Sequence, residues 1–315
     1  MSFDSPRAGI DYPATWQQFR DWFADDDACV DYLELLRWPN GFVCPLCGGG
    51  GWRISARRMW MCTECGRKTS VTAGTIFHRS RTPLSTWFAA AWLVTSSKNG
   101  VSALSLQQQL GFGSYETAWA WLHKLRRAMV RPERDLLTGI VEVDESFIGG
   151  VSAGNQGAST EKIPVQIAVE RIDARKLGRV RFAVADAPST LSLVEFAAGV
   201  VEPGSTIRTD GSRMMRRLAA MGYTHEYATG YDAEDPTAVL PGVHLVASLL
   251  KRWLIGTLHY RVSEEHLPYY LDEYAFRFNR RKSTARGMLF YRLLQQAVAT
   301  DPHPLSELFA KTPTL

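Results

Sequence analysis

Apolar and polar positions divide the chain into a helical first part and a mixed second part. Apolar residues recur at helical spacing from about Trp16 to Leu36, which predicts a helical lead-in. A second helix is predicted to have Thr82 as N-cap and Pro83 as first residue and to reach about Ser97. Two more are predicted over 102–110 and 115–130, with the turn Gly111–Ser114 between them. Such a pair is typical of a helix-turn-helix, although an ordinary helical hairpin has the same pattern.

From residue 140 onward the pattern changes to short β-branched segments that alternate with helical ones. Strands are predicted over 140–147, 165–171, 179–186, 206–210 and 225–228, and helices over 191–201, 214–221, 243–255 and 263–281. Three strands in succession followed by alternating helices and strands favour a mixed α/β sheet. In a sheet of this order the first and fourth strands can be neighbours. The glycine-rich stretch 149–157 is predicted to connect the first two strands.

Four of the five cysteines form two pairs, Cys44 with Cys47 and Cys62 with Cys65, and a glycine follows each pair. Two residues between thiolates let one tight turn present both sulfurs to a tetrahedral ion. Short apolar segments at 52–55 and 59–61 are typical of strands, so the unit is predicted to be a zinc ribbon that binds a structural Zn²⁺. Disulfides are the alternative, and the absence of an export signal disfavours them. Cys29 stands apart and is predicted to be a buried helix residue.

Composition and charge narrow the class of protein further. Hydrophobic residues make up 45% and charged residues 22% of the 315 residues, which is ordinary for a globular protein. The sequence has no apolar run long enough for a membrane helix, so a cytoplasmic protein without a membrane partner is expected. The net charge of +4 is mild, so a nucleic-acid surface requires local basic clusters. One such stretch runs from Arg53 to Arg81, and a second contains Lys124, Arg126 and Arg127 and is predicted to bind DNA.

Two aspartates, Asp144 and Asp210, are candidate ligands for divalent metal ions. Asp144 lies within the first strand of the mixed sheet, on the same face as Glu142 and Ser146, and Asp210 ends the fourth strand. If those strands are neighbours, the two carboxylates meet at one edge of the core. Paired carboxylates can hold two divalent ions for phosphodiester chemistry, so the sequence favours Mg²⁺ or Mn²⁺ at this place. Each aspartate taken singly has an ordinary structural explanation, because Asp-Gly is a common turn.

Several sequence motifs, in the order in which they occur along the chain, resemble those of bacterial insertion-sequence transposases of the DDE superfamily. They include Phe42-Val-Cys-Pro-Leu-Cys-Gly, Ser70-Val-Thr-Ala-Gly-Thr-Ile-Phe-His, Val141-Glu-Val-Asp-Glu-Ser, Thr209-Asp-Gly, Ser248-Leu-Leu-Lys-Arg and Phe276-Arg-Phe-Asn-Arg-Arg. The resemblance implies an RNase H-like catalytic domain that cleaves and transfers DNA strands. It also implies that Asp144 and Asp210 are the first two catalytic acids.

The third catalytic position departs from the acidic pattern of the superfamily. Counting back from Ser248-Leu-Leu-Lys-Arg places His244 where many DDE enzymes have Glu. Lys251, seven residues further on the same helical face, is expected to belong to the catalytic group and to contact DNA, and Arg252 is a further candidate DNA contact. Imidazole favours softer ions than Mg²⁺, so His244 is expected to contact phosphate or a metal-bound water. The rival candidates for the third role are Asp232, Glu234, Asp235 and Glu264.

The resulting hypothesis is a transposase with five segments: helical residues 1–40, zinc ribbon 41–80, helix-turn-helix region 81–135, catalytic domain 138–295 and tail 296–315. Its expected partners are terminal inverted repeats and target DNA, bound by a homodimer or higher oligomer associated with the nucleoid. A catalytically inactive DNA-binding protein and a nuclease without strand transfer are the alternatives.

Overall fold

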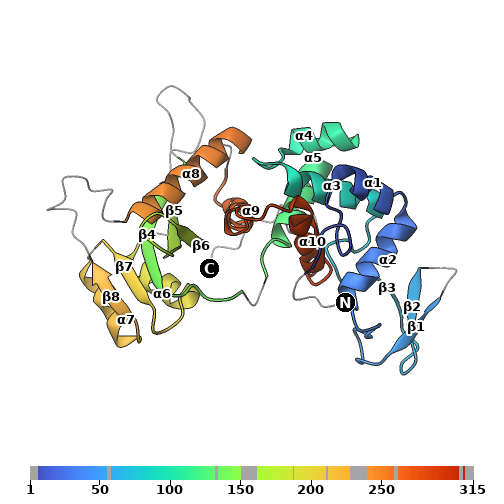
Figure 1. The fold of residues 1–315 in the computed structure, drawn as a ribbon, viewed down its shortest axis with the longest axis horizontal. Helices are drawn as coiled ribbons and strands as arrows, with labels where there is room; N and C mark the ends of the chain where they lie inside the picture. The colour runs from blue at the N-terminus through green and yellow to red at the C-terminus, as the bar shows by residue number, and fades with distance from the viewer. Residues whose placement is uncertain are drawn as a thin grey trace. The chain divides into compact units, whose positions relative to one another are not determined.

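The chain folds into two compact units, which we describe separately from a computed structural model (Figure 1). The described residues are 6–54, 58–131, 134–149, 162–186, 188–210, 212–227, 240–258, 262–304 and 308. The first unit contains residues 1–131 and 282–315, and the second contains residues 132–281. In the part of the chain that the structure describes, no helix combines the length and apolar character needed to cross a membrane.

Helices α1 (Trp16–Trp22), α2 (Asp26–Arg37) and α3 (Leu84–Ser96) form the core of the first unit. The predicted lead-in is two helices rather than one, because Asp25 caps a new helix by accepting the backbone N–H of Ala28. Helix α3 begins one residue later than predicted, with Pro83 as its N-cap. Proline offers no side-chain acceptor, and the Asp26 carboxylate of α2 instead accepts the N–H groups of Leu84 and Ser85. Cys29 is fully buried on α2, as predicted.

Helix α10 (Arg286–Ala297) packs in the first unit, against α3 and α2. Its Phe290 ring is fully buried and has edge or tilted contacts with Phe19, Phe23 and Phe88. The sequence analysis assigned this segment to the catalytic domain and predicted no helix in it. The structure corrects that boundary, because the aromatic core of α1–α3 is completed by a helix that is distant in sequence.

The predicted ribbon is a three-stranded antiparallel sheet in the order β1 (Gly51–Ile54), β2 (Met59–Cys62), β3 (Lys68–Ser70). A small core of Phe42, Cys44 and Cys62 packs under it, with the Phe42 and Trp60 rings stacked at 5.2 Å. Arg37 of α2 ties the ribbon to the helices by donating to the carbonyl oxygens of Ser70 and Val71.

Helices α4 (Ala103–Leu110) and α5 (Tyr115–Arg127) form the expected helical pair. Gly111 ends α4 in the left-handed conformation, with φ of 67°, which glycine adopts without strain. Ser114 caps α5 by accepting the N–H of Glu116. Trp87 of α3 stacks on Trp121 of α5 at 3.5 Å, which fastens the pair to the rest of the unit.

The second unit is built on a five-stranded mixed sheet in the order β6-β5-β4-β7-β8. Its strands are β4 (Ile140–Ile148), β5 (Ile163–Arg171), β6 (Leu177–Val184), β7 (Thr206–Thr209) and β8 (Thr224–Tyr227). The first three pair antiparallel, and β7 pairs parallel with both β4 and β8. The predicted order of elements, the neighbouring first and fourth strands, and the RNase H-like α/β fold class are confirmed.

Helices cover both faces of this sheet. On one face, helix α6 (Thr190–Val200), the 3₁₀ helix η2 (Arg213–Arg216) and α7 (Arg217–Ala220) enclose a core with Val141, Val143 and Ala168. On the other face, α8 (Pro241–Leu258) and α9 (Leu267–Asn279) pack on Val165, Ile167 and Val169. The alternation along β4 therefore directs Glu142 and Asp144 toward the α8 face.

Candidate functional site

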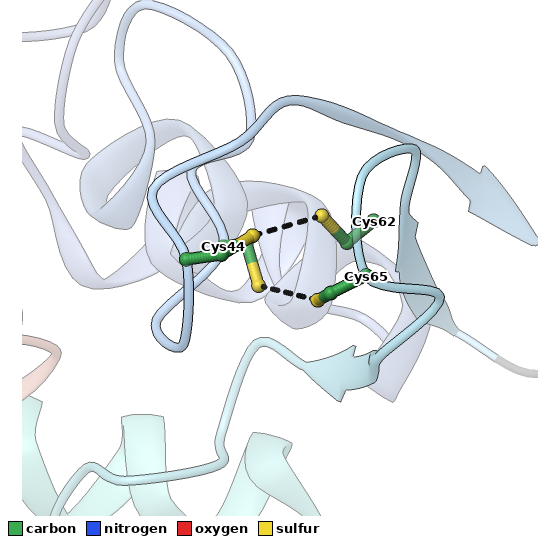
Figure 2. A group of neighbouring side chains, drawn as sticks. Cys44, Cys62 and Cys65 are labelled. Atoms are coloured by element: carbon green, nitrogen blue, oxygen red, sulfur yellow. Dashed lines mark hydrogen bonds between the residues drawn. The ribbon is translucent and has the colours of Figure 1, made fainter.

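Four thiols of the ribbon lie together between two loops (Figure 2). The sulfur atoms of Cys44, Cys47, Cys62 and Cys65 all lie within 4.8 Å of one another, with Cys44 Sγ 3.7 Å from Cys65 Sγ. Cys47 Sγ lies 3.5 Å from Cys62 Sγ. All four cysteines are free thiols, so the disulfide alternative does not describe this fold.

The spacing of the sulfurs fits a tetrahedral zinc ion. Zn–S bonds of about 2.3 Å place tetrahedral sulfurs about 3.8 Å apart, close to the separations found here. Gly48 and Gly66 follow the two pairs with φ of 76° and 68°, which explains the glycine at each position. Backbone N–H groups of Cys47 and Leu46 lower the pKa of the Cys44 thiol to about 7. Four protein ligands close the coordination shell, so such an ion stabilises the fold and leaves no position for substrate.

The two aspartates lie at one edge of the sheet in the second unit. Strands β4 and β7 pair in parallel from Ile140 with Thr206 to Glu142 with Arg208. Continuing that register by two residues brings Asp144 level with Asp210, which directly follows β7. Asp144 is half-buried and accepts the N–H of Glu145 at 2.8 Å, whereas Asp210 is exposed and accepts the N–H of Ser212 at 3.3 Å.

His244, on the first turn of α8, lies near Asp144. Burial raises the pKa of Asp144, and the nearby Asp210 carboxylate raises it further, whereas the Glu145 N–H and His244 lower it. Both Asp210 and His244 therefore lie close enough to act electrostatically on Asp144. Three separate elements, β4, the end of β7 and α8, bring these side chains together. The pKa of Asp144 is raised chiefly because its carboxylate is half-buried, and the second carboxylate nearby adds to the effect.

The remaining candidates lie at several places in the second unit. Lys251 is half-buried and Arg252 exposed on α8, and Lys251 follows His244 by two helical turns. Glu264 is exposed in the turn before α9. The rival acids Asp232, Glu234 and Asp235 lie outside the described residues.

The basic residues of α5 differ in exposure. Arg127 is exposed, Lys124 is half-buried with a pKa lowered by that burial, and Arg126 is only 2% exposed. The helical spacing explains the difference, because Arg126 falls on the stripe with Leu122 and Leu125 that packs inside the unit. The fold therefore does not support the predicted surface contact of Arg126 with DNA.

Acidic residues of α2 neutralise part of the basic stretch around the ribbon. Arg53 pairs with Asp31 at 2.7 Å, and Arg58 pairs with Asp27. These two arginines attach the ribbon to α2. Other members of the stretch are exposed and remain available for an anionic partner: Arg67, Lys68, Arg79 and Arg81.

Two residues of this unit have roles that the sequence analysis did not assign. Glu142 was placed on the Asp144 face, but its buried carboxylate in fact binds the start of α8. Asn279, at the end of α9, forms two hydrogen bonds to the backbone of Val180 on the edge strand β6. The available sequence signal for Glu142 was an acid between two valines. The signal for Asn279 was an asparagine among aromatic and basic residues. Neither pattern names the partner, which only the fold supplies.

Comparison with known families agrees with this arrangement. Residues 136–279 match an ISXO2-like transposase domain of the DDE type, and residues 24–68 match a transposase zinc-ribbon domain. The first match contains Asp144, Asp210 and His244, and the second contains all four clustered cysteines. No curated protein matches the chain. Two transposase domain families thus match in the order that the fold displays, and the chain belongs to the insertion-sequence transposases that join a zinc ribbon to an ISXO2-like DDE domain.

Proposed function

We propose that this transposase cleaves and transfers DNA strands with Asp144 and Asp210 as ligands of catalytic Mg²⁺ or Mn²⁺ and His244 as the third group of the site. The observation that carries the proposal is the convergence of Asp210 and His244 on Asp144 from separate elements. Carboxylate oxygens are the donors that both ions accept, so this donor set fits. When bound, such ions activate an attacking oxygen and stabilise the leaving oxygen of a phosphodiester.

The chain's own residues contribute position and charge. Asp144 lies on β4 and Asp210 directly follows the adjacent parallel strand β7, so the sheet holds the two carboxylates near each other before DNA arrives. His244, on the first turn of a helix whose inner face is buried, is likewise held in place. The proposed reaction has two parts. Water first cleaves the phosphodiester at the end of the element and frees a 3′ hydroxyl group, and that hydroxyl group then attacks a target phosphodiester, which joins the strands and releases a 3′ hydroxyl group of the target.

DNA is proposed to bind through both units. In the second unit, Lys251 and Arg252 lie on the helix that carries His244, two turns further on. In the first unit, the exposed ribbon residues Arg67 and Lys68 and the exposed Arg127 of α5 supply positive charge for the terminal inverted repeats. An assembly of two or more copies on paired element ends completes the proposal.

Cleavage of a labelled duplex that carries the element's end tests the catalytic assignment. Asp144→Asn and Asp210→Asn are each expected to abolish metal-dependent cleavage while the dissociation constant for the duplex stays close to wild type. Glu264→Ala, which removes the described rival acid, serves as the matched control and is expected to cleave normally. Cleavage by either Asp variant would remove that residue from the proposal, and an inactive wild type that still binds the duplex would favour the DNA-binding alternative.

The third group is tested by metal preference, because imidazole accepts Mn²⁺ more readily than Mg²⁺. His244→Ala is expected to lose most strand transfer, and His244→Glu to retain activity and shift its preference toward Mg²⁺. Capture of the labelled end by a target plasmid separates a transposase from a nuclease without strand transfer. Wild-type transfer by His244→Ala would return the third role to an acid.

DNA engagement by α8 has a separate test. Lys251→Ala is expected to weaken duplex binding and to reduce the slope of log affinity against log salt by about 0.9, the value for one phosphate contact. An unchanged slope would remove Lys251 from the DNA path.

A further inference from the structure

Glu142 is a buried acid two residues before Asp144 on the same face of β4. It is 2% exposed and stands between Val141 and Val143, which face the opposite core. A buried carboxylate requires partners, because an unpaired charge in the interior is strongly destabilising. Its contacts therefore indicate why the chain retains an acid at this position.

Both carboxylate oxygens of Glu142 have partners. Oε2 accepts the backbone N–H groups of Gly242 at 2.7 Å and Val243 at 3.0 Å, and Oε1 pairs with Arg171 Nε at 3.3 Å. Gly242 and Val243 belong to the first turn of α8, where N–H groups have no partner within the helix. Leu240, the residue before this helix, has an apolar side chain and cannot cap it. Glu142 thus caps α8 from the neighbouring strand, and Arg171 holds the carboxylate.

Glu142 and the N–H groups that it binds are close in sequence to Asp144 and His244. Residues two apart on a strand point to the same face and lie about 7 Å apart, so Glu142 and Asp144 are neighbours along β4. His244 directly follows Val243, the second N–H donor. Fixing the first turn of α8 on Glu142 therefore fixes the starting point of the His244 side chain relative to Asp144.

The contact also depends on the absence of a side chain at position 242. A Cβ atom added to Gly242 would lie 2.8 Å from Glu142 Oε2 and 3.1 Å from Leu177 Cδ2. The helix start would have to move away from the strand to admit it. Gly242→Ala therefore disturbs the contact between Glu142 and the first turn of α8 while leaving the Glu142 carboxylate in place.

We infer that Glu142 is a positioning residue, which fixes the first turn of α8 so that the His244 side chain lies close to Asp144 and Asp210. The inference rests on the proposed role of His244 in cleavage. Glu142 does not itself act on DNA or metal in this scheme, since both of its oxygens are engaged by protein donors.

The chain contains a matched control on the other face of the sheet. Glu170 of β5 is also buried, accepts the N–H groups of Thr138 and Arg179, and pairs with the Arg179 side chain at 2.6 Å. A Cβ atom on Gly178 would lie 2.6 Å from Glu170 Oε2, which repeats the relation of Gly242 to Glu142. Glu170 stands opposite Val141 in the β4–β5 register and therefore faces α6, away from α8. Glu170→Gln and Gly178→Ala thus reproduce the chemical changes without reaching His244.

The test measures single-turnover cleavage in Mn²⁺ with Glu142→Gln and Gly242→Ala, each alone and combined with His244→Ala. Both single variants are expected to lose about tenfold to a hundredfold in rate, the cost of misplacing a catalytic group by about 1 Å. Neither should change the dissociation constant for DNA. In the His244→Ala background the additional loss is expected to fall below about threefold, because a residue that acts through His244 has no effect once the imidazole is absent. The control variants are expected to have the same small effect in both backgrounds.

Hydrogen exchange of α8 provides a readout that does not require activity. Glu142→Gln and Gly242→Ala are expected to increase exchange in the first turn of α8, and the control variants are not. Full, undiminished rate losses in the His244→Ala background would overturn the inference and leave Glu142 a purely structural residue. Unchanged α8 exchange would also overturn it, and Gly242→Ala decides the matter if Glu142→Gln does not fold. If His244→Ala itself cleaves normally, the proposed role of His244 is wrong and the inference about Glu142 is wrong with it. This result differs from undiminished rate losses in the His244→Ala background and from unchanged hydrogen exchange in α8, which contradict the inference alone.

Discussion

Replacing Phe290 with alanine tests whether helix α10 belongs to the first unit. Phe290 is fully buried, and its ring lies within 6.5 Å of five other aromatic rings: Phe19, Phe23, Tyr32, Phe88 and Trp92. Phe→Ala in a core costs about 3–5 kcal/mol, and aromatic pairs of this kind add about 0.5–1.5 kcal/mol each without being additive. We therefore expect a loss near the upper end, about 5 kcal/mol.

A loss of this size is a large share of the roughly 5–15 kcal/mol that stabilises an ordinary domain. It should lower the unfolding temperature of the first unit by about 10–20 °C. Hydrogen exchange read by mass spectrometry at increasing denaturant locates the damage. Protection is expected to fall in α1, α2 and α3 and to stay near wild type in β4 and β5.

Phe182→Ala is the matched control in the second unit, where the Phe182 ring is 9% exposed and lies 5.7 Å from the Tyr274 ring. It should reduce protection in β5, β6 and α9 and spare α3. If Phe290→Ala loosens the β4–β5 sheet and leaves α3 protected, the assignment of α10 to the first unit is wrong. A loss below about 1 kcal/mol would also contradict it, because a void of that size in a closed core cannot be so well tolerated.

Two other predictions concern the metal sites. Cys44→Ser is expected to abolish zinc binding and to increase hydrogen exchange in β1 and β2, since zinc supplies the folding energy of such ribbons, whereas Cys29→Ser on α2 should keep its zinc; equal zinc content in both variants would refute the cluster as the site. Burial and Asp210 raise the pKa of Asp144, so ionisation of Asp144 opposes folding. The free energy of unfolding of the metal-free protein should therefore fall as the pH rises from the ordinary pKa of an aspartate through the raised pKa of Asp144. Asp144→Asn removes this fall and should make the metal-free protein more stable than wild type near pH 7, measured by urea unfolding. A variant less stable than wild type at that pH would contradict the reasoning.

Local patterns predicted much of the fold. The order of strands and helices in the second unit follows from β-branched runs and apolar spacing, which depend on neighbouring residues alone. The metal centre of the ribbon was equally accessible, because the spacing of Cys44, Cys47, Cys62 and Cys65 encodes the turns that present the sulfurs. The approach of Asp144 to Asp210 needed one further step, the pairing of the first and fourth strands.

Contacts between distant elements were the part that sequence patterns did not supply. Helix α3 is capped by Asp26 and helix α8 by Glu142, and both helices begin after a residue with no side-chain acceptor. For α3 the sequence predicted the adjacent Thr82 as the cap, whereas the N–H groups of its first turn are satisfied by an acid that is distant in sequence. Arg126 illustrates the opposite error, because a basic run was taken as an exposed surface while the helix turned one of its members inward.

The string Phe276-Arg-Phe-Asn-Arg-Arg shows why a family motif does not separate residues of chemistry from residues of architecture. Arg280 lies over the Phe276 ring at 4.1 Å and Arg281 over the Phe278 ring at 3.9 Å, while Asn279 occupies both hydrogen-bonding groups of Val180. Strand β6 is the edge of the sheet, where unpaired backbone groups invite pairing with another chain. The motif therefore fastens α9 along this edge, and because α8 and α9 share one core over β5, it also supports the helix that brings His244 to the aspartates.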